Sequence, residues 1–213
     1  MSARPPEAGN RLLIVAPLRT EARALRRGAP GVRVVRTGMG SERSRRAVAR
    51  LRCDPAERVV VAGFCGALDE TLVPGQVVVA SELRGMTRQV LEVPQGLVEA
   101  LEREGLEVRV VPLVSVPRVA RGGDRLALRA SGAQAVDMES VWLAACAVGR
   151  PFAVVRVVLD GPRHELLRPA FARNLLRAAR SLRRVARALD LWVESQPLQK
   201  PAAGIRAAAT GEA

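Results

Sequence analysis

Aromatic residues are scarce in this chain, since they make up 2% of its 213 residues and tyrosine is absent. Proteins that hold single-stranded nucleic acid stack its bases on aromatic side chains, and no helix-turn-helix or zinc-finger spacing is present either. Lysine is almost absent as well, because Lys200 is the only one among 34 basic residues. The net charge of +13 therefore indicates compositional bias and nonspecific, salt-sensitive retention of nucleic acid, and we expect no specific nucleic-acid partner.

Cysteine and histidine are too few for a disulfide framework or a metal centre. The three cysteines, Cys53, Cys65 and Cys146, are odd in number and lie in apolar or helical surroundings, which is typical of reduced thiols in the cytosol. The single histidine, His164, lies in a charged segment, where a solvated side chain is the simplest interpretation. We therefore expect no metal and no cofactor.

Long apolar runs are also missing. Hydrophobic residues make up 48% of the chain, but no run approaches the roughly 20 residues that span a bilayer, and residues 1–10 lack the apolar stretch of a signal peptide. We expect a cytoplasmic protein with one domain over residues 11–195, which is long enough to bury a full core. Residues 1–10 and the tail 196–213 are predicted to be disordered.

Apolar segments that alternate with amphipathic ones predict an α/β fold. Helices are expected over residues 42–52, with Ser41 as N-cap, over 139–148, and from Pro169 to about Val193. The predicted strands are residues 12–16, 32–36, 59–62, 76–80, 108–113 and 152–159.

Two carboxylates stand at the ends of apolar elements. Glu139 opens an apolar helical run, and Asp160 closes a β-branched run whose only earlier charge is Arg156, so both are expected to face a cleft. Two such acids suit cleavage of a glycosidic bond to a nitrogen heterocycle. Glu139 would bind ribose hydroxyls and favour an oxocarbenium-like transition state, while Asp160, partly protonated, would protonate the departing base. The alternative is that they only favour a helix start and a strand end.

Four motifs in order resemble the purine nucleoside phosphorylase and methylthioadenosine/adenosylhomocysteine nucleosidase superfamily. They are residues 12–21, 37–40, 59–80 and the pair VDME (136–139) with VVRVVLD (154–160). The resemblance covers about residues 11–193. It implies a single-domain nucleoside phosphorylase-like fold, with a central mixed twisted sheet flanked by helices. It also implies a small-molecule nucleoside substrate, phosphate or water as co-substrate, and a homo-oligomer.

The same resemblance assigns the substrate side of the site. Met138 and Glu139 match the ribose clamp, Arg156 its support, and Asp160 the acid at the base. Gly63 and Phe64 match the glycine turn after the central strand, although an ordinary tight turn would leave the same pattern.

The nucleophile side is assigned less sharply. Arg19, Gly38 and Gly40 match phosphate-binding positions, whereas Glu21 matches the residue that activates water in nucleosidases. The alternative for Arg19 is a solvated turn residue, and for Gly38 and Gly40 it is an ordinary turn. For Glu21 the alternative is a charge that favours the helix N-terminus. Phosphorolysis and hydrolysis therefore both stay open.

Two departures separate the chain from the family pattern. Phe64 and Leu159 stand where the family commonly has serine, and residues 82–135 are shorter than in methylthioadenosine nucleosidases. Residues 63–66 and 157–166 are similar to the hopanoid-associated phosphorylases, which implies release of adenine from adenosylhopane in hopanoid biosynthesis. A methylthioadenosine/adenosylhomocysteine-type nucleosidase and a non-catalytic nucleoside-binding protein are the alternatives.

A basic face on the last predicted helix suggests peripheral association with the inner face of an anionic membrane. A solvated arginine face that packs on the core is the simpler interpretation. The arginines are Arg173, Arg177, Arg180, Arg183, Arg184 and Arg187.

Overall fold

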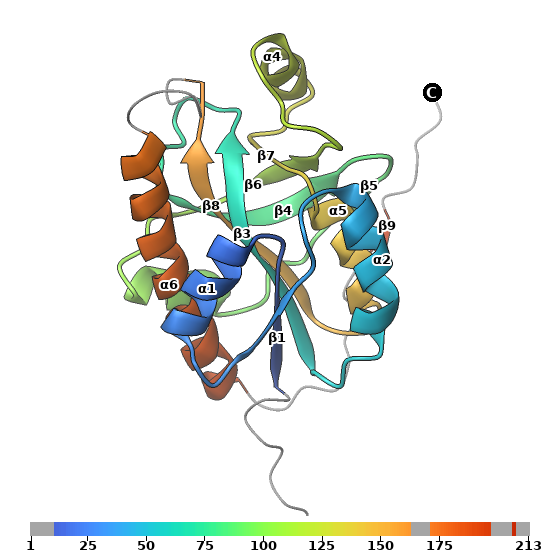
Figure 1. Cartoon of the computed structure of the whole chain (residues 1–213), viewed down its shortest axis with the longest axis vertical. Helices are drawn as coiled ribbons and strands as arrows, with labels where there is room; N and C mark the ends of the chain where they lie inside the picture. The colour runs from blue at the N-terminus through green and yellow to red at the C-terminus, as the bar shows by residue number, and fades with distance from the viewer. Residues whose placement is uncertain (1–10, 163–170, 197–205, 208–213) are drawn as a thin grey trace, which may run out of the picture.

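The fold is known from a computed structural model that describes residues 11–162, 171–196 and 206–207. Strands lie in the centre, with helices on both sides (Figure 1). The strands are β1 (Leu12–Ala16), β2 (Arg33–Arg36), β3 (Arg58–Ala67), β4 (Val77–Arg84), β5 (Arg88–Val90), β6 (Val108–Ser115), β7 (Ala135–Asp137), β8 (Phe152–Asp160) and β9 (Arg206–Ala207). The helices are α1 (Arg19–Gly28), α2 (Ser41–Arg52), α3 (Leu97–Arg103), α4 (Gly123–Ala130), α5 (Ser140–Leu143), the 3-10 helix η2 (Ala144–Ala147) and α6 (Phe171–Ser195).

One mixed sheet contains the nine described strands. β1 lies between β2 and β3 and is parallel to both. β3 pairs with β8 and β7, β8 pairs with β4, and β6 links β4 to β7. β3, β8, β4, β6 and β7 therefore form a closed ring. The structure confirms the predicted single-domain α/β fold with a mixed, helix-flanked sheet.

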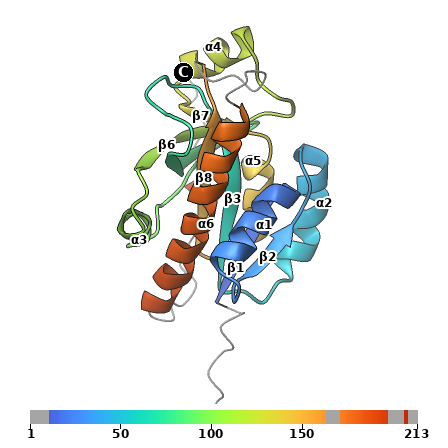
Figure 2. The same ribbon diagram turned by 60° about the vertical axis from the view of Figure 1, so that its left-hand side comes forward.

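Helices cover both faces of the central strands, which explains why every residue of β1 and β3 is buried. α1, α3 and α6 pack on one face, and α2, α5 and η2 pack on the other. α1 and α6 lie side by side (Figure 2). A Cβ at Gly28 of α1 would lie 2.1 Å from the carbonyl oxygen of Arg183 in α6, so only glycine permits this approach.

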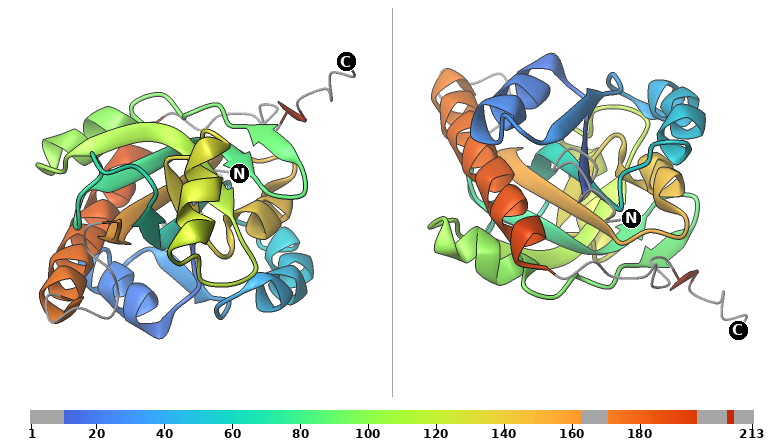
Figure 3. Two further views of the ribbon diagram at one scale, coloured as in Figure 1. Left: turned by 90° about the horizontal axis from the view of Figure 1, so that it is seen from above. Right: turned by 90° about the horizontal axis from the view of Figure 1, so that it is seen from below.

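The carboxyl ends of β1, β3 and β8 meet at one end of the molecule, because these three strands are mutually parallel. Viewed from above, α4 lies over this end (Figure 3). The loops that leave parallel strands at their carboxyl ends are the usual place for a ligand in α/β proteins.

Several local predictions were wrong. Residues 63–66 lie within β3 and not in a turn after it, because β8 pairs with β3 as far as Gly66. Gly40, not Ser41, caps α2. Glu139 is the N-cap of α5, which gives way to η2 at Ala144 and does not continue to residue 148.

Other predictions fall partly outside the described residues. Pro169 and the residues 1–10 are not among them, and α6 is described from Phe171. Of the predicted tail, Gln196 and the short strand β9, which pairs with β5, are described.

Candidate functional site

A cavity opens where β1, β3 and β8 end. Its lining brings together Glu21, Phe64, Met138, Glu139 and Asp160, which are predicted site residues from four separate parts of the sequence. Leu18, Met39, Val116, Val119 and Leu159 add an apolar lining. An apolar cavity with a few converging polar groups is the usual form of a small-molecule site.

Glu21 is held in the cavity by backbone donors. It lies in the first turn of α1, and its carboxylate accepts hydrogen bonds from the N–H of Leu18 at 2.6 Å and of Phe64 at 2.7 Å. Burial raises the pKa of Glu21 to about 7, although Arg156 and these two donors oppose the rise. A carboxylate with such a pKa can accept a proton near neutral pH.

Arg156 is the buried cation at the centre of the site. Its Nη2 lies 2.5 Å from Oδ2 of Asp137 and 3.8 Å from Oε2 of Glu139, and it donates to Oγ of Ser140 at 2.8 Å. Its Nη1 is buried and has no hydrogen-bond partner among the described residues. A Cβ at Gly63 would lie 2.6 Å from both this Nη1 and Oε1 of Glu21, so glycine lets the two groups approach each other.

Asp137 fixes the orientation of Arg156. Oδ1 of Asp137 accepts a 2.5 Å hydrogen bond from Oγ of Ser115, and Oδ2 accepts one from the N–H of Ser140 at 3.2 Å. Together with Arg156, which contacts Oδ2, these donors engage both carboxylate oxygens, and they satisfy a buried charge that would otherwise be costly.

Glu139 faces the loop that follows β2. Its Oε1 accepts a 2.9 Å hydrogen bond from the N–H of Gly40. Burial raises its pKa, Arg156 opposes the rise, and the charge of Asp137 adds to it. Gly38 and Gly40 both have positive φ, at 96° and 95°, so the loop that presents this N–H depends on glycine.

Asp160 forms an ion pair with Nη2 of Arg125, a residue of α4. Arg125 also donates to the carbonyl of Ala67 at 2.8 Å and to that of Ala120 at 3.1 Å. Arg125 was not anticipated as a partner of Asp160, and the role of Asp160 as the acid at the base stays a prediction.

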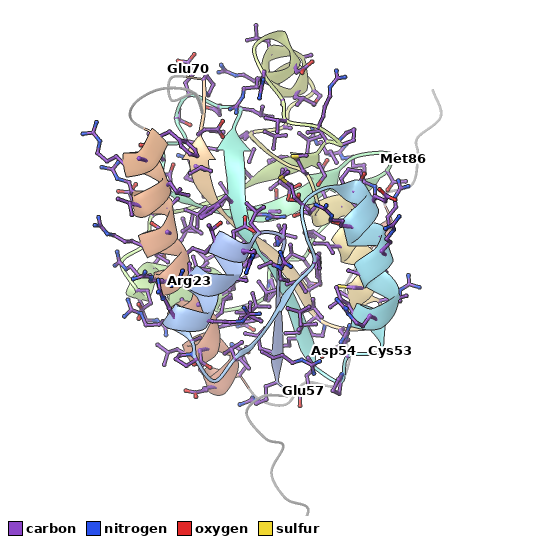
Figure 4. The ribbon with its side chains drawn as sticks, viewed as in Figure 1. Arg23, Cys53, Asp54, Glu57, Glu70 and Met86 are labelled. Carbon is purple, nitrogen blue, oxygen red and sulfur yellow. The ribbon has the colours of Figure 1, made fainter. Side chains whose placement is uncertain are left out.

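The structure places some predicted residues elsewhere. Arg19 is exposed and does not line the cavity; it belongs to a separate groove along α1, together with Arg23, Arg26, Arg27 and Arg36. Arg23 marks the position of this groove in Figure 4. Gly38 does not line the cavity either; it packs against the side chain of Arg43. Phe64 contributes its backbone N–H to Glu21.

Three polar residues of the site were missed by the sequence analysis: Arg125, Asp137 and Ser140. Asp137 is part of the VDME motif and Ser140 follows it directly, so the motif was the available signal for both. Arg125 carried none, since arginines occur throughout the chain.

Two further chemistries have little support in the described part of the chain. It holds no group of three or more His, Cys, Asp or Glu side chains that could bind a metal ion. Cys65 lines the cavity, but burial raises its pKa, which keeps it as an unreactive thiol.

The described helices include none that is long and apolar enough to cross a membrane.

Comparison with known proteins gives a family and a shared fold. Residues 25–189 match the model of the phosphorylase superfamily. A comparison with curated protein sequences found no significant match.

Three similar solved structures have comparable overlap with the chain. The 5′-methylthioadenosine/S-adenosylhomocysteine nucleosidase of Colwellia psychrerythraea, in complex with adenine, has a TM-score of 0.70 at 20% identity and covers 87% of this chain and 96% of its own. The nucleosidase of the same name from Neisseria meningitidis has a TM-score of 0.69 at 22% identity, covering 85% and 99%. Futalosine hydrolase of Helicobacter pylori has a TM-score of 0.70 at 16% identity, covering 88% and 98%.

Proposed function

The chain belongs to the phosphorylase superfamily, and from this we propose that it cleaves the N-glycosidic bond of a purine nucleoside and releases adenine. The observation that carries the proposal is the convergence of Glu21, Glu139 and Asp160 on one cavity. Each carboxylate has a different set of partners: Glu21 accepts from two backbone N–H groups, Glu139 accepts from one and lies 3.8 Å from Arg156, and Asp160 pairs with Arg125. Three distinct environments allow three distinct roles.

The proposed reaction assigns one role to each carboxylate. Glu139, with Met138 beside it, binds the ribose hydroxyls, and its negative charge stabilises the oxocarbenium-like transition state. Asp160 is the acid that protonates the departing base. Glu21 takes the proton of the attacking water as the oxygen bonds to the anomeric carbon. The bond between that carbon and the base nitrogen breaks, the base keeps the electron pair, and it leaves with the proton that Asp160 supplies; Asp160 regains a proton from the solvent.

Water is the proposed nucleophile, for three reasons. Glu21 has a pKa of about 7, so it is partly ionised at neutral pH, as a general base requires. Nη1 of Arg156, which has no hydrogen-bond partner among the described residues, lies beside the Glu21 carboxylate, where it can donate to a bound water. Arg19, the predicted phosphate ligand, lies outside the cavity, and the Gly40 N–H is already bonded to Glu139.

The 5′ substituent of the substrate is proposed to be large and apolar, as in adenosylhopane. Met39 and Val119 line the cavity and are 47% and 38% exposed, so they provide an apolar rim that can extend the site beyond the nucleoside. The resemblance to hopanoid-associated phosphorylases supports the same substrate. Methylthioadenosine, with its small apolar substituent, is the second candidate, because the same rim can cover a methylthio group.

We propose that the protein acts in the cytoplasm at the inner face of an anionic membrane, where a lipidic nucleoside would be found. Arg173, Arg180 and Arg183 of α6 are exposed, whereas Arg184 is half-buried and bonded to the Glu104 carbonyl. α1, which lies against α6, adds the arginines of its groove.

A homo-oligomer remains a prediction.

The substrate panel that tests this function comprises adenosine, methylthioadenosine, adenosylhomocysteine and adenosylhopane. Each is incubated with and without phosphate, and adenine and the sugar product are quantified. Hydrolysis predicts free sugar in both buffers. The proposed apolar 5′ substituent predicts the highest kcat/KM for adenosylhopane. A 1-phosphorylated sugar would show phosphorolysis, and failure to release adenine from any of the four would refute the proposed function.

A further inference from the structure

The Ser140 hydroxyl bridges a buried carboxylate and a buried guanidinium. Its Oγ donates to Oδ2 of Asp137 and accepts hydrogen bonds from Nη2 of Arg156 at 2.8 Å and from Nε at 3.3 Å. Ser140 and Arg156 are both 0% exposed, so solvent does not compete for these bonds. The donor and the acceptor sites of the hydroxyl are therefore both occupied by charged groups.

The backbone around Ser140 gives this hydroxyl a defined position. Ser140 is the first residue of α5, directly after the N-cap Glu139, and its N–H donates to Oδ2 of Asp137 at 3.2 Å. The next residue, Val141, donates its N–H to Oγ of Ser115 at 3.0 Å, and Ser115 lies on β6 opposite Asp137 of β7. The start of α5 is thereby tied to the ends of two strands.

The hydroxyl determines which edge of the Arg156 guanidinium faces Glu21. A guanidinium is planar and presents its donors in a fixed fork. Nε and Nη2 both donate to Ser140, and Nη2 also contacts Oδ2 of Asp137 at 2.5 Å. Because this edge of the plane is held, the remaining nitrogen, Nη1, lies next to Gly63. A Cβ at Gly63 would be 2.6 Å from this Nη1 and 2.6 Å from Oε1 of Glu21.

Asp137 alone would leave two orientations of the guanidinium open. A planar guanidinium can bind a carboxylate bidentately through Nε and Nη2 or through Nη1 and Nη2. In the second orientation Nη1 would turn toward Asp137 and away from Glu21. The Ser140 hydroxyl accepts from Nε and Nη2, so it selects the first orientation.

We propose that Ser140 is a positioning residue whose hydroxyl holds the Nε–Nη2 edge of Arg156 and thereby keeps Nη1 beside the Glu21 carboxylate. The inference rests on the proposed function, because it specifies how the site keeps a cation next to its general base. Arginine stays protonated in proteins, so the hydroxyl transfers no proton and acts only by fixing the place of a charge.

The position of Nη1 affects the pH at which Glu21 can accept a proton. Burial raises the pKa of Glu21 to about 7, and Arg156 opposes this rise. If Nη1 moves away, the opposing effect weakens and the pKa of Glu21 rises further. Less of Glu21 is then ionised at pH 7, and the general base is weakened without any change to Glu21 itself.

Other ionisable groups also face Glu21, and the test has to keep them constant. Of these groups, Asp137 bonds to the Ser140 hydroxyl. Variants that keep or lose the hydroxyl leave every charged residue of the site in place. Besides Arg156, the groups are Glu139 of α5, Asp137 of β7, Cys65 of β3, Asp160 of β8 and Arg125 of α4.

The test is a titration of Glu21 by carbon-13 NMR of the glutamate side chains, with Glu21→Gln to identify the signal. In Ser140→Ala the midpoint should rise by about 0.5 pH unit or more, which is the effect of a unit charge that retreats by about 1 Å. Ser140→Thr keeps the hydroxyl and should titrate like the wild type. So should the control Ser81→Ala, which changes a half-buried serine of β4 outside the cavity. A merely structural role would lower the melting temperature of Ser140→Ala and leave the midpoint unchanged, and this result would overturn the inference.

A kinetic measurement gives a second readout. The rising limb of kcat/KM in Ser140→Ala should move to higher pH with the Glu21 midpoint, while KM changes little because Ser140 does not line the cavity. Ser140→Cys fills the same space with a weak hydrogen-bond acceptor, so it should behave like Ser140→Ala and serves if that variant folds poorly. A rising limb at the wild-type pH in both variants would contradict the positioning role.

The titration needs no substrate, so its outcome is separable from that of the proposed function. A raised Glu21 midpoint in Ser140→Ala, with no adenine released from any nucleoside, would refute the reaction and support the placement of Arg156 by Ser140. Adenine release by the wild type, with the same Glu21 midpoint in all of these variants, would overturn the role of Ser140 alone.

Discussion

The Glu139 carboxylate accepts a 2.9 Å hydrogen bond from the backbone N–H of Gly40, a residue 99 positions earlier in the chain. The contact ties the loop after β2 to the start of α5, and it directs one carboxylate oxygen to this loop. The other lies 3.8 Å from Arg156. Since both partners are fixed, the carboxylate is preorganised for a ligand with two neighbouring hydroxyls.

Glu139→Gln should weaken binding of ribosides and lower kcat together. A neutral amide accepts fewer hydrogen bonds and cannot stabilise the positive charge of the transition state. We expect a loss in kcat/KM of about 10²-fold or more. Glu99→Gln changes an exposed glutamate in the first turn of α3 and should have no effect. If the wild type processed 2′-deoxy nucleosides as well as ribosides, Glu139 could not be the ribose clamp.

Asp160→Asn should abolish most turnover while the nucleoside still binds. The amide can neither supply a proton to the departing base nor form the ion pair with Arg125, and proton donation acts mainly in the transition state, so we expect kcat to fall by about 10²- to 10⁴-fold. Steady-state kinetics and binding of a non-hydrolysable analogue separate the two effects. Asp124→Asn, on the exposed surface of α4, is the matched control. Kinetics of Asp160→Asn that equal those of the wild type would remove Asp160 from the mechanism.

The sequence was sufficient for the parts of the site that stand at the ends of apolar runs. Glu139 and Asp160 were found in this way, and Arg156 was visible as the single charge within a buried strand. These signals are local, because burial of an element and the position of its end can be recognised from consecutive residues.

The parts that depend on distant segments could not be predicted in the same way. The closed ring of strands arises from the pairing of β7 with both β3 and β6, and such pairing leaves no periodic pattern in either segment. Arg125 belongs to a helix with no buried residues, so nothing local separates it from the other arginines. Phe64 stands where the family commonly has serine, but it contacts Glu21 through its backbone N–H, which any residue but proline supplies.

The pH dependence of kcat/KM should follow the ionisation of Glu21. Only the carboxylate form can accept a proton from water. Because burial raises its pKa to about 7, activity should rise between pH 6 and pH 8 and reach a plateau above. Glu21→Gln should lose about 10²- to 10⁴-fold in rate and lose this rising limb as well. Glu42→Gln, in the exposed first turn of α2, should keep the wild-type profile. A rate that is constant from pH 5 to pH 9 would argue against Glu21 as the base.

Vesicle binding should depend on the exposed arginines of α6. Sedimentation is expected to show binding to vesicles with anionic lipid that weakens with salt, and little binding to neutral vesicles. Replacing Arg173, Arg180 and Arg183 with glutamine should remove the difference, whereas the same change at Arg45, Arg46 and Arg50 of α2, which removes equal charge, should largely preserve it. Hydrolysis of soluble nucleosides should be unaffected in both triple variants. Equal and negligible binding to both vesicle types at low salt would contradict the membrane association.

The most direct measurement is adenine release by the purified protein in phosphate-free buffer, followed over several turnovers with methylthioadenosine and with adenosylhopane in detergent. We expect one adenine per free sugar, with no dependence on added phosphate, and loss of this activity in Glu21→Gln and in Asp160→Asn. Release that needs phosphate, or release that both variants sustain at the wild-type rate, would contradict hydrolysis by the three carboxylates of this cavity.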